Sequence, residues 1–212
     1  FSQAKLENKH YVFPGNKSIR VIPVCPIENG MMVTNGQEKE KWALGSIPKL
    51  GFPESTFDIT FRLDVPIKKQ VALFTYSENA WDQAQLGFHI TAKGEVLLRI
   101  NLTKEPVPVH FKLMSKPMEW ATGIHHLRTT LETDGMARIY LNGRLVAETD
   151  NAPGLGSFKL PAVKWHPYAT FGCTMERNTP EQLLQGAIGA VTIYDRILAP
   201  IAPKKTSDDV NI

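Results

Sequence analysis

Residues 56–64 read Thr-Phe-Asp-Ile-Thr-Phe-Arg-Leu-Asp, and this stretch decides the fold class. Apolar side chains occupy every second position, at Phe57, Ile59, Phe61 and Leu63, and polar side chains fill the positions between them. A period of two places alternate residues on opposite faces of a β-strand. The stretch therefore predicts a strand with one face on a core, as in an antiparallel sheet.

The same alternation recurs along the chain, and helical periodicity is scarce. Leu86, Phe88 and Ile90 face one way, while Gly87 and His89 face the other. We expect further strands at 18–24, 69–76, 95–102, 107–114, 124–132, 137–141, 144–148, 169–173 and 187–194. The predicted core comprises Phe57, Ile59, Phe61, Leu86, Phe88, Ile90, Ile139, Leu141, Val191 and Ile193.

Turn signals separate the strands. Asn142-Gly143 is a strong hairpin signal, because both central residues of a type I′ turn need positive φ. Asp134-Gly135 is a second such signal, so residues 124–148 predict a three-stranded meander. Helix is expected only in short pieces, with Thr179 as an N-cap and Pro180 at a first helical position.

Composition indicates one globular domain. The 212 residues are 42% hydrophobic and 21% charged, with a formal net charge of +3. That charge is too small to indicate a nucleic-acid partner, and no apolar run reaches the roughly eighteen residues of a membrane-spanning helix. We expect a single domain over residues 1–200 and a loose tail over 201–212.

Cysteines and glycosylation sequons bear on the cellular location. Cys25 and Cys173 match no metal-binding spacing, so they either form one disulfide or remain two buried thiols. Asn16 and Asn101 begin sequons for N-glycosylation. The expected location is extracellular or at the cell surface.

Three segments resemble a known superfamily of β-sandwiches. Residues 137–146, Ala-Arg-Ile-Tyr-Leu-Asn-Gly-Arg-Leu-Val, resemble a strand–turn–strand of laminin-G-like domains. Residues 186–200, Gly-rich at the start, are similar to the closing strand of those domains, and residues 57–76 look pentraxin-like. The resemblance implies a two-sheet antiparallel jelly roll of the concanavalin A-like and laminin-G-like kind.

A narrower resemblance concerns residues 171–178, Phe-Gly-Cys-Thr-Met-Glu-Arg-Asn. This segment is similar to one in the sialic-acid-binding carbohydrate modules and lectin-like domains of sialidases. That resemblance implies that Arg177 and Arg99 hold the carboxylate of an acidic sugar, and a planar guanidinium suits a carboxylate. Met175-Glu176 stands where those modules have a lysine, with one residue inserted.

The polar positions of several strands suggest a groove. Asp58, Thr60, Arg62, His89 and Arg99 all alternate away from core positions, on strands that we expect to be neighbours. They would either line one polar groove for an acidic sugar or form a solvated face with ordinary cross-strand ion pairs.

A tryptophan in a polar loop is a further candidate. Trp81 lies within Glu-Asn-Ala-Trp-Asp-Gln, residues 78–83, and is expected either to support the face of a sugar ring or to plug the core. The core role is expected of the other three, Trp42, Trp120 and Trp165.

Metal binding is not expected. Asn79 and Asp82 offer oxygen ligands for calcium, and calcium is the one ion left open, but residues 173–176 add only the carboxylate of Glu176. His125 and His126 are neighbours on a predicted strand, so they point to opposite faces and cannot hold one metal together. No cofactor is predicted.

Catalytic motifs are absent from the sequence. It contains no Glu-x-Asp-x-x-Glu strand of the sandwich glucanases, no Gly-x-Ser-x-Gly and no phosphate loop. The sequence therefore favours a non-catalytic, lectin-like domain whose partner is a glycan, sialylated or otherwise acidic, within a larger secreted or surface protein such as a sialidase. The alternatives are a laminin-G-like structural or protein-interaction module without a sugar site, and a polysaccharide hydrolase or lyase.

Overall fold

The computed structural model describes residues 5–7, 10–13, 17–22, 25–36, 42–46, 54–77, 86–102, 109–153, 168–176 and 179–200. These residues form two large antiparallel sheets and one small two-stranded ribbon. The described residues include no helix, and so none that could cross a membrane. The prediction of an all-β sandwich is confirmed.

The first sheet has nine strands in the spatial order β1-β2-β3-β6-β15-β8-β9-β10-β11. Their bounds are Lys5–Glu7 (β1), His10–Phe13 (β2), Lys17–Ile22 (β3), Trp42–Ser46 (β6), Tyr168–Phe171 (β15), Val71–Ser77 (β8), Leu86–Ile90 (β9), Val96–Leu102 (β10) and Val109–Met114 (β11).

The second sheet has seven strands in the order β14-β13-β12-β7-β18-β5-β4. Their bounds are Arg144–Thr149 (β14), Ala137–Leu141 (β13), Gly123–Leu131 (β12), Ser55–Leu63 (β7), Gln185–Tyr194 (β18), Met31–Asn35 (β5) and Ile27–Glu28 (β4). The ribbon pairs β16 (Thr174–Glu176) with β17 (Thr179–Glu181).

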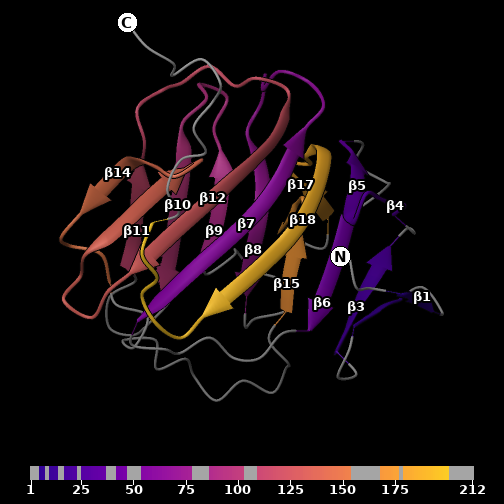
Figure 1. Ribbon diagram of the computed structural model, residues 1–212, viewed down its shortest axis with the longest axis horizontal. Coiled ribbons are helices and arrows are strands. Elements are labelled where there is room, and N and C mark those ends of the chain that lie inside the picture. Colours follow the sequence, from indigo (N-terminus) through magenta and orange to yellow (C-terminus); the bar gives the residue numbers. More distant parts are fainter. Residues whose placement is uncertain are drawn as a thin grey trace, which may run out of the picture.

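The two sheets lie face to face, and Figure 1 shows the long strands β7, β12 and β18 crossing in front of the nine-stranded sheet. β18 pairs with β5 on one side and with β7 on the other. A strand near the end of the chain thus lies beside one from the first forty residues, as the jelly-roll interpretation predicted.

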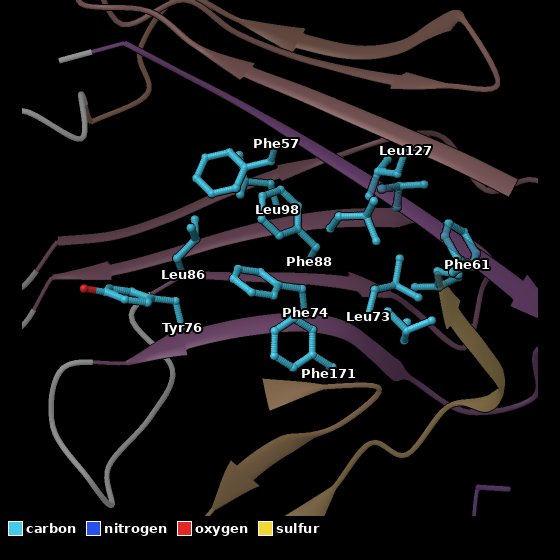
Figure 2. Packing of buried hydrophobic residues seen from close by; sticks show 14 of the residues in the cluster. Phe57, Phe61, Leu73, Phe74, Tyr76, Leu86, Phe88, Leu98, Leu127 and Phe171 are labelled. Atoms are coloured by element: carbon cyan, nitrogen blue, oxygen red, sulfur yellow. The ribbon is translucent and has the colours of Figure 1, made fainter. Parts of the chain in front are cut away.

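The core fills the space between the sheets. Phe57 of β7 lies 5.1 Å from Phe88 of β9 between ring centroids, and Phe74 of β8 lies 5.5 Å from Phe171 of β15. Figure 2 shows these four rings in one row, with Phe88, Phe74 and Phe171 on neighbouring strands of the nine-stranded sheet and Phe57 on the other sheet. In β7 and β9 the apolar face that the sequence predicted to be buried lies on the core, so that prediction is confirmed; in β9 the opposite face is buried as well.

Three predicted core residues are less buried than expected. Leu141, Val191 and Ile193 are only half-buried, whereas the other seven are fully buried. Val191 and Ile193 lie in the second half of β18, after a register shift that follows Ile188. This half of the strand still packs against the core but is covered less completely.

The predicted helix start at Thr179 is wrong. Thr179 and Pro180 lie in β17, where Pro180 is opposite Met175 in the ribbon. A proline is compatible with such a two-stranded edge, because there its missing N–H need not face a partner strand. The prediction for Asn142-Gly143 is confirmed, since their φ values are 50° and 81°, as a type I′ turn requires. Asp134-Gly135 does lie between the paired strands β12 and β13, but there only Gly135 has positive φ, at 91°.

The predicted domain bounds stay predictions. Strands from residues 5–200 join the two large sheets or the ribbon, and residues 201–212 lie outside the described residues.

Candidate ligand-binding site on the nine-stranded sheet

One row of residues runs across the middle of the nine-stranded sheet on the face away from the core. Gly87 of β9 pairs with Thr75 of β8 and with Arg99 of β10, and Thr75 pairs with Thr170 of β15. Residues directly opposite each other in a sheet share a face. Because Phe88 faces the core, Gly87 and its partners face outward.

The missing side chain of Gly87 makes room for a histidine. A Cβ atom at Gly87 would lie only 2.3 Å from Nε2 of His89. The imidazole of His89 therefore leans along its own strand and lies over the glycine. This brings the ring toward the row that contains Thr75 and Arg99.

His89 is buried, and the side chain of Gln182 is its polar neighbour. His89 is 2% exposed, and neither ring nitrogen has a partner of normal geometry among the described residues. Oε1 of Gln182 accepts a hydrogen bond of 2.9 Å from Nε2 of Gln70. Buried polar groups are nearly always paired, so a buried imidazole of this kind needs an explanation, such as a ligand.

The charge state of His89 follows from its surroundings. Burial lowers the pKa of His89 to about 4, the Gln182 side chain opposes this shift, and the positive charge of Arg99 adds to it. The ring is therefore neutral at neutral pH and offers one donor and one acceptor. Arg99 lies opposite Gly87, over which the His89 ring lies, so these two predicted site residues are close to each other.

Two threonines continue the row with a fixed direction of hydrogen bonding. Oγ1 of Thr170 donates to the carbonyl oxygen of Cys173 at 2.6 Å, so it accepts from Oγ1 of Thr75 at 2.5 Å. The Thr75 hydroxyl has then used its proton and retains only acceptor capacity. The row thus combines a cationic donor at Arg99 with an acceptor at Thr75.

The predicted groove that joins Asp58 and Arg62 to His89 and Arg99 is wrong. Asp58, Thr60 and Arg62 lie on β7, in the seven-stranded sheet, whereas His89 and Arg99 lie in the other sheet. Each set faces away from the core, so the two sets lie on opposite outer faces of the sandwich. Strand alternation gives the face of a residue but not the sheet to which its strand belongs.

Asp58 and Arg62 have ion-pair partners of their own. Asp58 accepts two hydrogen bonds from Arg128, at 2.7 and 2.6 Å, and Arg128 also donates to the carbonyl of Ala199. Arg62 donates to both carboxylate oxygens of Asp64, at 2.6 and 3.0 Å. These contacts support the structural interpretation of this face, with one cross-strand ion pair, one local ion pair and a hydrogen bond to the chain after β18.

Arg177 and Trp81 lie outside the described residues, as do Asn79 and Asp82. Their predicted roles therefore stay predictions. No group of three or more metal-binding side chains occurs among the residues that the structure describes.

Trp120 and the adjacent histidines His125 and His126 lie as the sequence predicted. Trp120 has the expected structural role, since its Nε1–H donates to the Gly94 carbonyl at 2.9 Å and its ring lies against Phe61. His125 packs on the same tryptophan, whereas His126 is on the other face, 3.8 Å from Asp58, as alternation predicted.

The sequon asparagine Asn101 is buried, being only 3% exposed. Its Oδ1 lies 3.1 Å from Nδ1 of His110 on the neighbouring strand. Asn16 lies outside the described residues. The Asn101 sequon therefore lends no support to an extracellular location.

Both cysteines are buried thiols. Cys25 and Cys173 are unbridged, 1% and 0% exposed. Burial raises the pKa of Cys173 to about 12, against the effect of a hydrogen bond with Thr170, and Cys25 adds to the increase. Of the two alternatives left open by the sequence, the structure has the buried thiols.

Thr75, Thr170 and Gly87 were not found from the sequence. Gly87 did give a signal, because a glycine inside a strand pattern often marks a close approach of other groups. The threonines gave none, since their strands β8 and β15 are separated by almost half of the chain and meet only in the folded sheet.

No protein-family model and no curated protein matches this chain. Solved structures do match. The CBM40 module of the Ruminococcus gnavus IT-sialidase, bound to alpha2,3 sialyllactose, aligns with a TM-score of 0.56 and 16% identity, over 70% of this chain and 79% of that one.

Two larger proteins also contain a similar fold. A NanB sialidase from Streptococcus pneumoniae aligns with a TM-score of 0.57 and 18% identity, over 83% of this chain and 27% of that one. The binding domain of botulinum neurotoxin DC, in complex with rat synaptotagmin II, aligns with a TM-score of 0.61 and 12% identity, over 92% of this chain and 48% of that one. At these identities the likeness shows the fold alone. In fold, the chain resembles a sialidase carbohydrate module, as the sequence predicted.

Proposed function

We propose that this chain is a non-catalytic carbohydrate-binding domain for acidic glycans, with its site on the outer face of the nine-stranded sheet. The observation that carries the proposal is His89, a buried neutral imidazole whose ring nitrogens make no hydrogen bond of normal geometry among the described residues, held over Gly87 and near the charge of Arg99. A ligand that brings hydroxyls and an anionic group would offer hydrogen bonds to the imidazole and a charge complementary to that of Arg99.

The chemistry of the row suits a sugar acid. Arg99 would pair with a carboxylate, because charge-assisted guanidinium–carboxylate hydrogen bonds are the strong kind. The neutral ring of His89 would exchange hydrogen bonds with a sugar hydroxyl as donor or acceptor, and Thr75 would accept from another. From the sequence resemblance we propose Arg177 as a second carboxylate ligand and Trp81 as a flanking ring.

A similar solved structure that contains a bound sialylated sugar supports the proposal. The IT-sialidase CBM40 is bound to alpha2,3 sialyllactose, and most of that module aligns with this chain. We extend the proposal to an extracellular or cell-surface location and to membership of a larger protein, as expected from the sequence. Asp58 and Arg62 are not part of the proposed site.

Binding measurements with a charged and a neutral glycan test the proposal. Titration with sialyllactose, followed by NMR or calorimetry, should give a dissociation constant near the millimolar range. This corresponds to a binding free energy of about −4 kcal/mol. Lactose, which lacks the carboxylate, should bind at least tenfold more weakly. Equal binding of both sugars would refute the acidic-glycan proposal, and a glycan array without any hit would favour a protein-interaction module.

Two variants locate the site. Arg99→Ala should abolish detectable sialyllactose binding while the domain stays folded at the assay temperature. Arg99→Lys should retain only part of the sialyllactose binding. Arg144→Ala is the matched control, because Arg144 is an exposed arginine on β14 of the other sheet. Loss of binding in the control, or its retention in Arg99→Ala, would place the site elsewhere.

A further inference from the structure

A pocket of about 470 Å³ is lined by residues none of which belongs to the row of Gly87. It lies beside residues 64–70, which carry the chain from β7 in one sheet to β8 in the other. Its size is within the range of pockets that hold small organic molecules. Nothing described above for the glycan site uses it.

The walls of this pocket are mainly apolar. Val65, Pro66 and Ile67 come from the crossing loop, Val71 comes from the start of β8, and Leu183 comes from the segment before β18. Sugars carry hydroxyls around the whole ring and would leave them unpaired against such walls, at a cost in free energy. The walls therefore favour a ligand with an apolar body.

The pocket also has a charge of one sign. Lys68 and Lys69 line it and are both exposed, and no aspartate or glutamate among the described residues lines it. The carboxylate next to the loop, Asp64, is bound at both oxygens by Arg62. The two lysines are thus not neutralised by that neighbour, and they attract an anionic group to the pocket.

Hydrogen bonds fix the frame of the pocket. The backbone N–H of Asp64 donates to the Gln185 carbonyl at 3.2 Å, and that of Ala72 donates to the Gln182 carbonyl at 2.7 Å. Gly36, with φ of 73°, packs so closely that a Cβ there would lie 2.9 Å from Cβ of Gln185. A site built in this way is largely formed before a ligand arrives, which lowers the entropic cost of binding.

We propose that this pocket binds a small amphipathic anion, with its apolar body against Val65, Ile67 and Leu183 and its carboxylate or sulfonate at Lys68 and Lys69. A free fatty acid of medium chain length has this chemistry. The inference is independent of the glycan site, because the two share no ligand-contacting residue.

A fluorescence titration tests the inference on the intact chain. The probe is 8-anilinonaphthalene-1-sulfonate, which is itself an amphipathic anion, and decanoate below its micelle concentration is the competitor. We expect saturable binding of one probe per chain, displaced by decanoate and not by decanol at the same concentration. Binding that does not saturate, or equal displacement by the neutral alcohol, would overturn the proposal.

Paired variants separate this pocket from any other apolar surface. Lys68→Gln with Lys69→Gln should weaken decanoate binding about fivefold or more, as expected for the loss of two exposed ion pairs. Lys93→Gln with Lys116→Gln removes the same charge from two exposed lysines that do not line the pocket, and should leave binding unchanged. Equal weakening by both pairs would show a general charge effect and refute the assignment.

A cavity-filling variant and a membrane control complete the test. Val65→Trp should reduce probe binding strongly while the unfolding midpoint stays within a few degrees of the parent. If Val65→Trp is unfolded, Leu183→Phe provides the second filling variant. The membrane control is co-sedimentation of the chain with phosphatidylglycerol vesicles. If the chain sediments with the vesicles only when Lys68 and Lys69 are present, and does not bind decanoate, the lysines contact a membrane surface and the proposal is overturned.

Discussion

Replacing Gly87 with alanine tests the contact that organises the proposed glycan site. The added Cβ would lie 2.3 Å from Nε2, 3.2 Å from Cδ2 and 3.3 Å from Cε1 of His89. Nonbonded carbon and nitrogen atoms prefer separations of about 3.5–4.0 Å, so the ring must move by more than about 1 Å. Since His89 is only 2% exposed, there is little free space into which it can move.

The expected free-energy change has two parts. Overpacking in a filled site costs about 1–3 kcal/mol. Alanine is favoured over glycine within a strand by about 0.5–1 kcal/mol, because glycine loses more conformational entropy on folding. Gly87→Ala should therefore lower the free energy of unfolding by roughly 0.5–2 kcal/mol, and it should weaken sialyllactose binding at least tenfold, because the imidazole is displaced.

The decisive measurement is a double-mutant cycle with His89→Ala, followed by urea denaturation at constant m-value. Without the imidazole, the new methyl group no longer meets Nε2, so the same Gly87→Ala change should become neutral or stabilising. The sign of the effect thus depends on the background. Equal destabilisation in both backgrounds would show that the histidine does not lie over the glycine, and would refute the reasoning about the site.

Four other measurements check separate parts of the structure. Phe61→Ala should lower the free energy of unfolding by about 3–5 kcal/mol in denaturant melts, because the ring is fully buried, and a loss below about 1 kcal/mol would mean that the assigned core face is wrong. The pKa of His89 is lowered to about 4 in the folded state from 6.5, so its contribution to stability is complete above pH 6.5 and is lost as the pH falls toward 4. This loss is about 3 kcal/mol, and a pH series of melts on His89→Gln should lack it. Asp58→Asn should lower the free energy of unfolding by about 2–4 kcal/mol, because it leaves the nearly buried Arg128 without its carboxylate. Asp64→Asn, at the more exposed pair with Arg62, should lower it by under about 1 kcal/mol, and equal losses would contradict this assignment. Cys173 should react with Ellman's reagent only after unfolding, since burial raises its pKa to about 12, and rapid reaction of the native protein would contradict the buried position.

Local patterns in the sequence predicted much of the fold. The alternation around Phe57 and Phe88 gave the correct buried face for β7 and β9, because each of these strands has one face on the core. Asn142-Gly143 predicted its hairpin for a physical reason that holds in any context, the need for positive φ at both positions. Such signals depend on neighbouring residues alone, and the sequence contains them in full.

The errors lie where long-range arrangement decides the outcome. Thr179 and Pro180 have the local chemistry of a helix start, yet pairing with β16 makes them a strand. Asp58 and His89 both alternate outward, yet they belong to different sheets. The association of Thr75 with Thr170 depends on which strands become neighbours, and no local pattern in this chain specifies that.

The position of β18 has a consequence for how the chain folds. β18 lies between β5 and β7, so the seven-stranded sheet stays divided until the residues at 185–194 have been synthesised and have joined it. Its partners lie far back in the sequence, and closing such long loops before their contacts form makes folding slow. During that interval the backbone N–H and C=O groups along this edge of β7 have no partner strand, which exposes a strand edge of the aggregation-prone kind. Ribosome-bound chains that end before residue 185 should therefore be sensitive to protease and bound by chaperones, and the addition of β18 should remove both properties together.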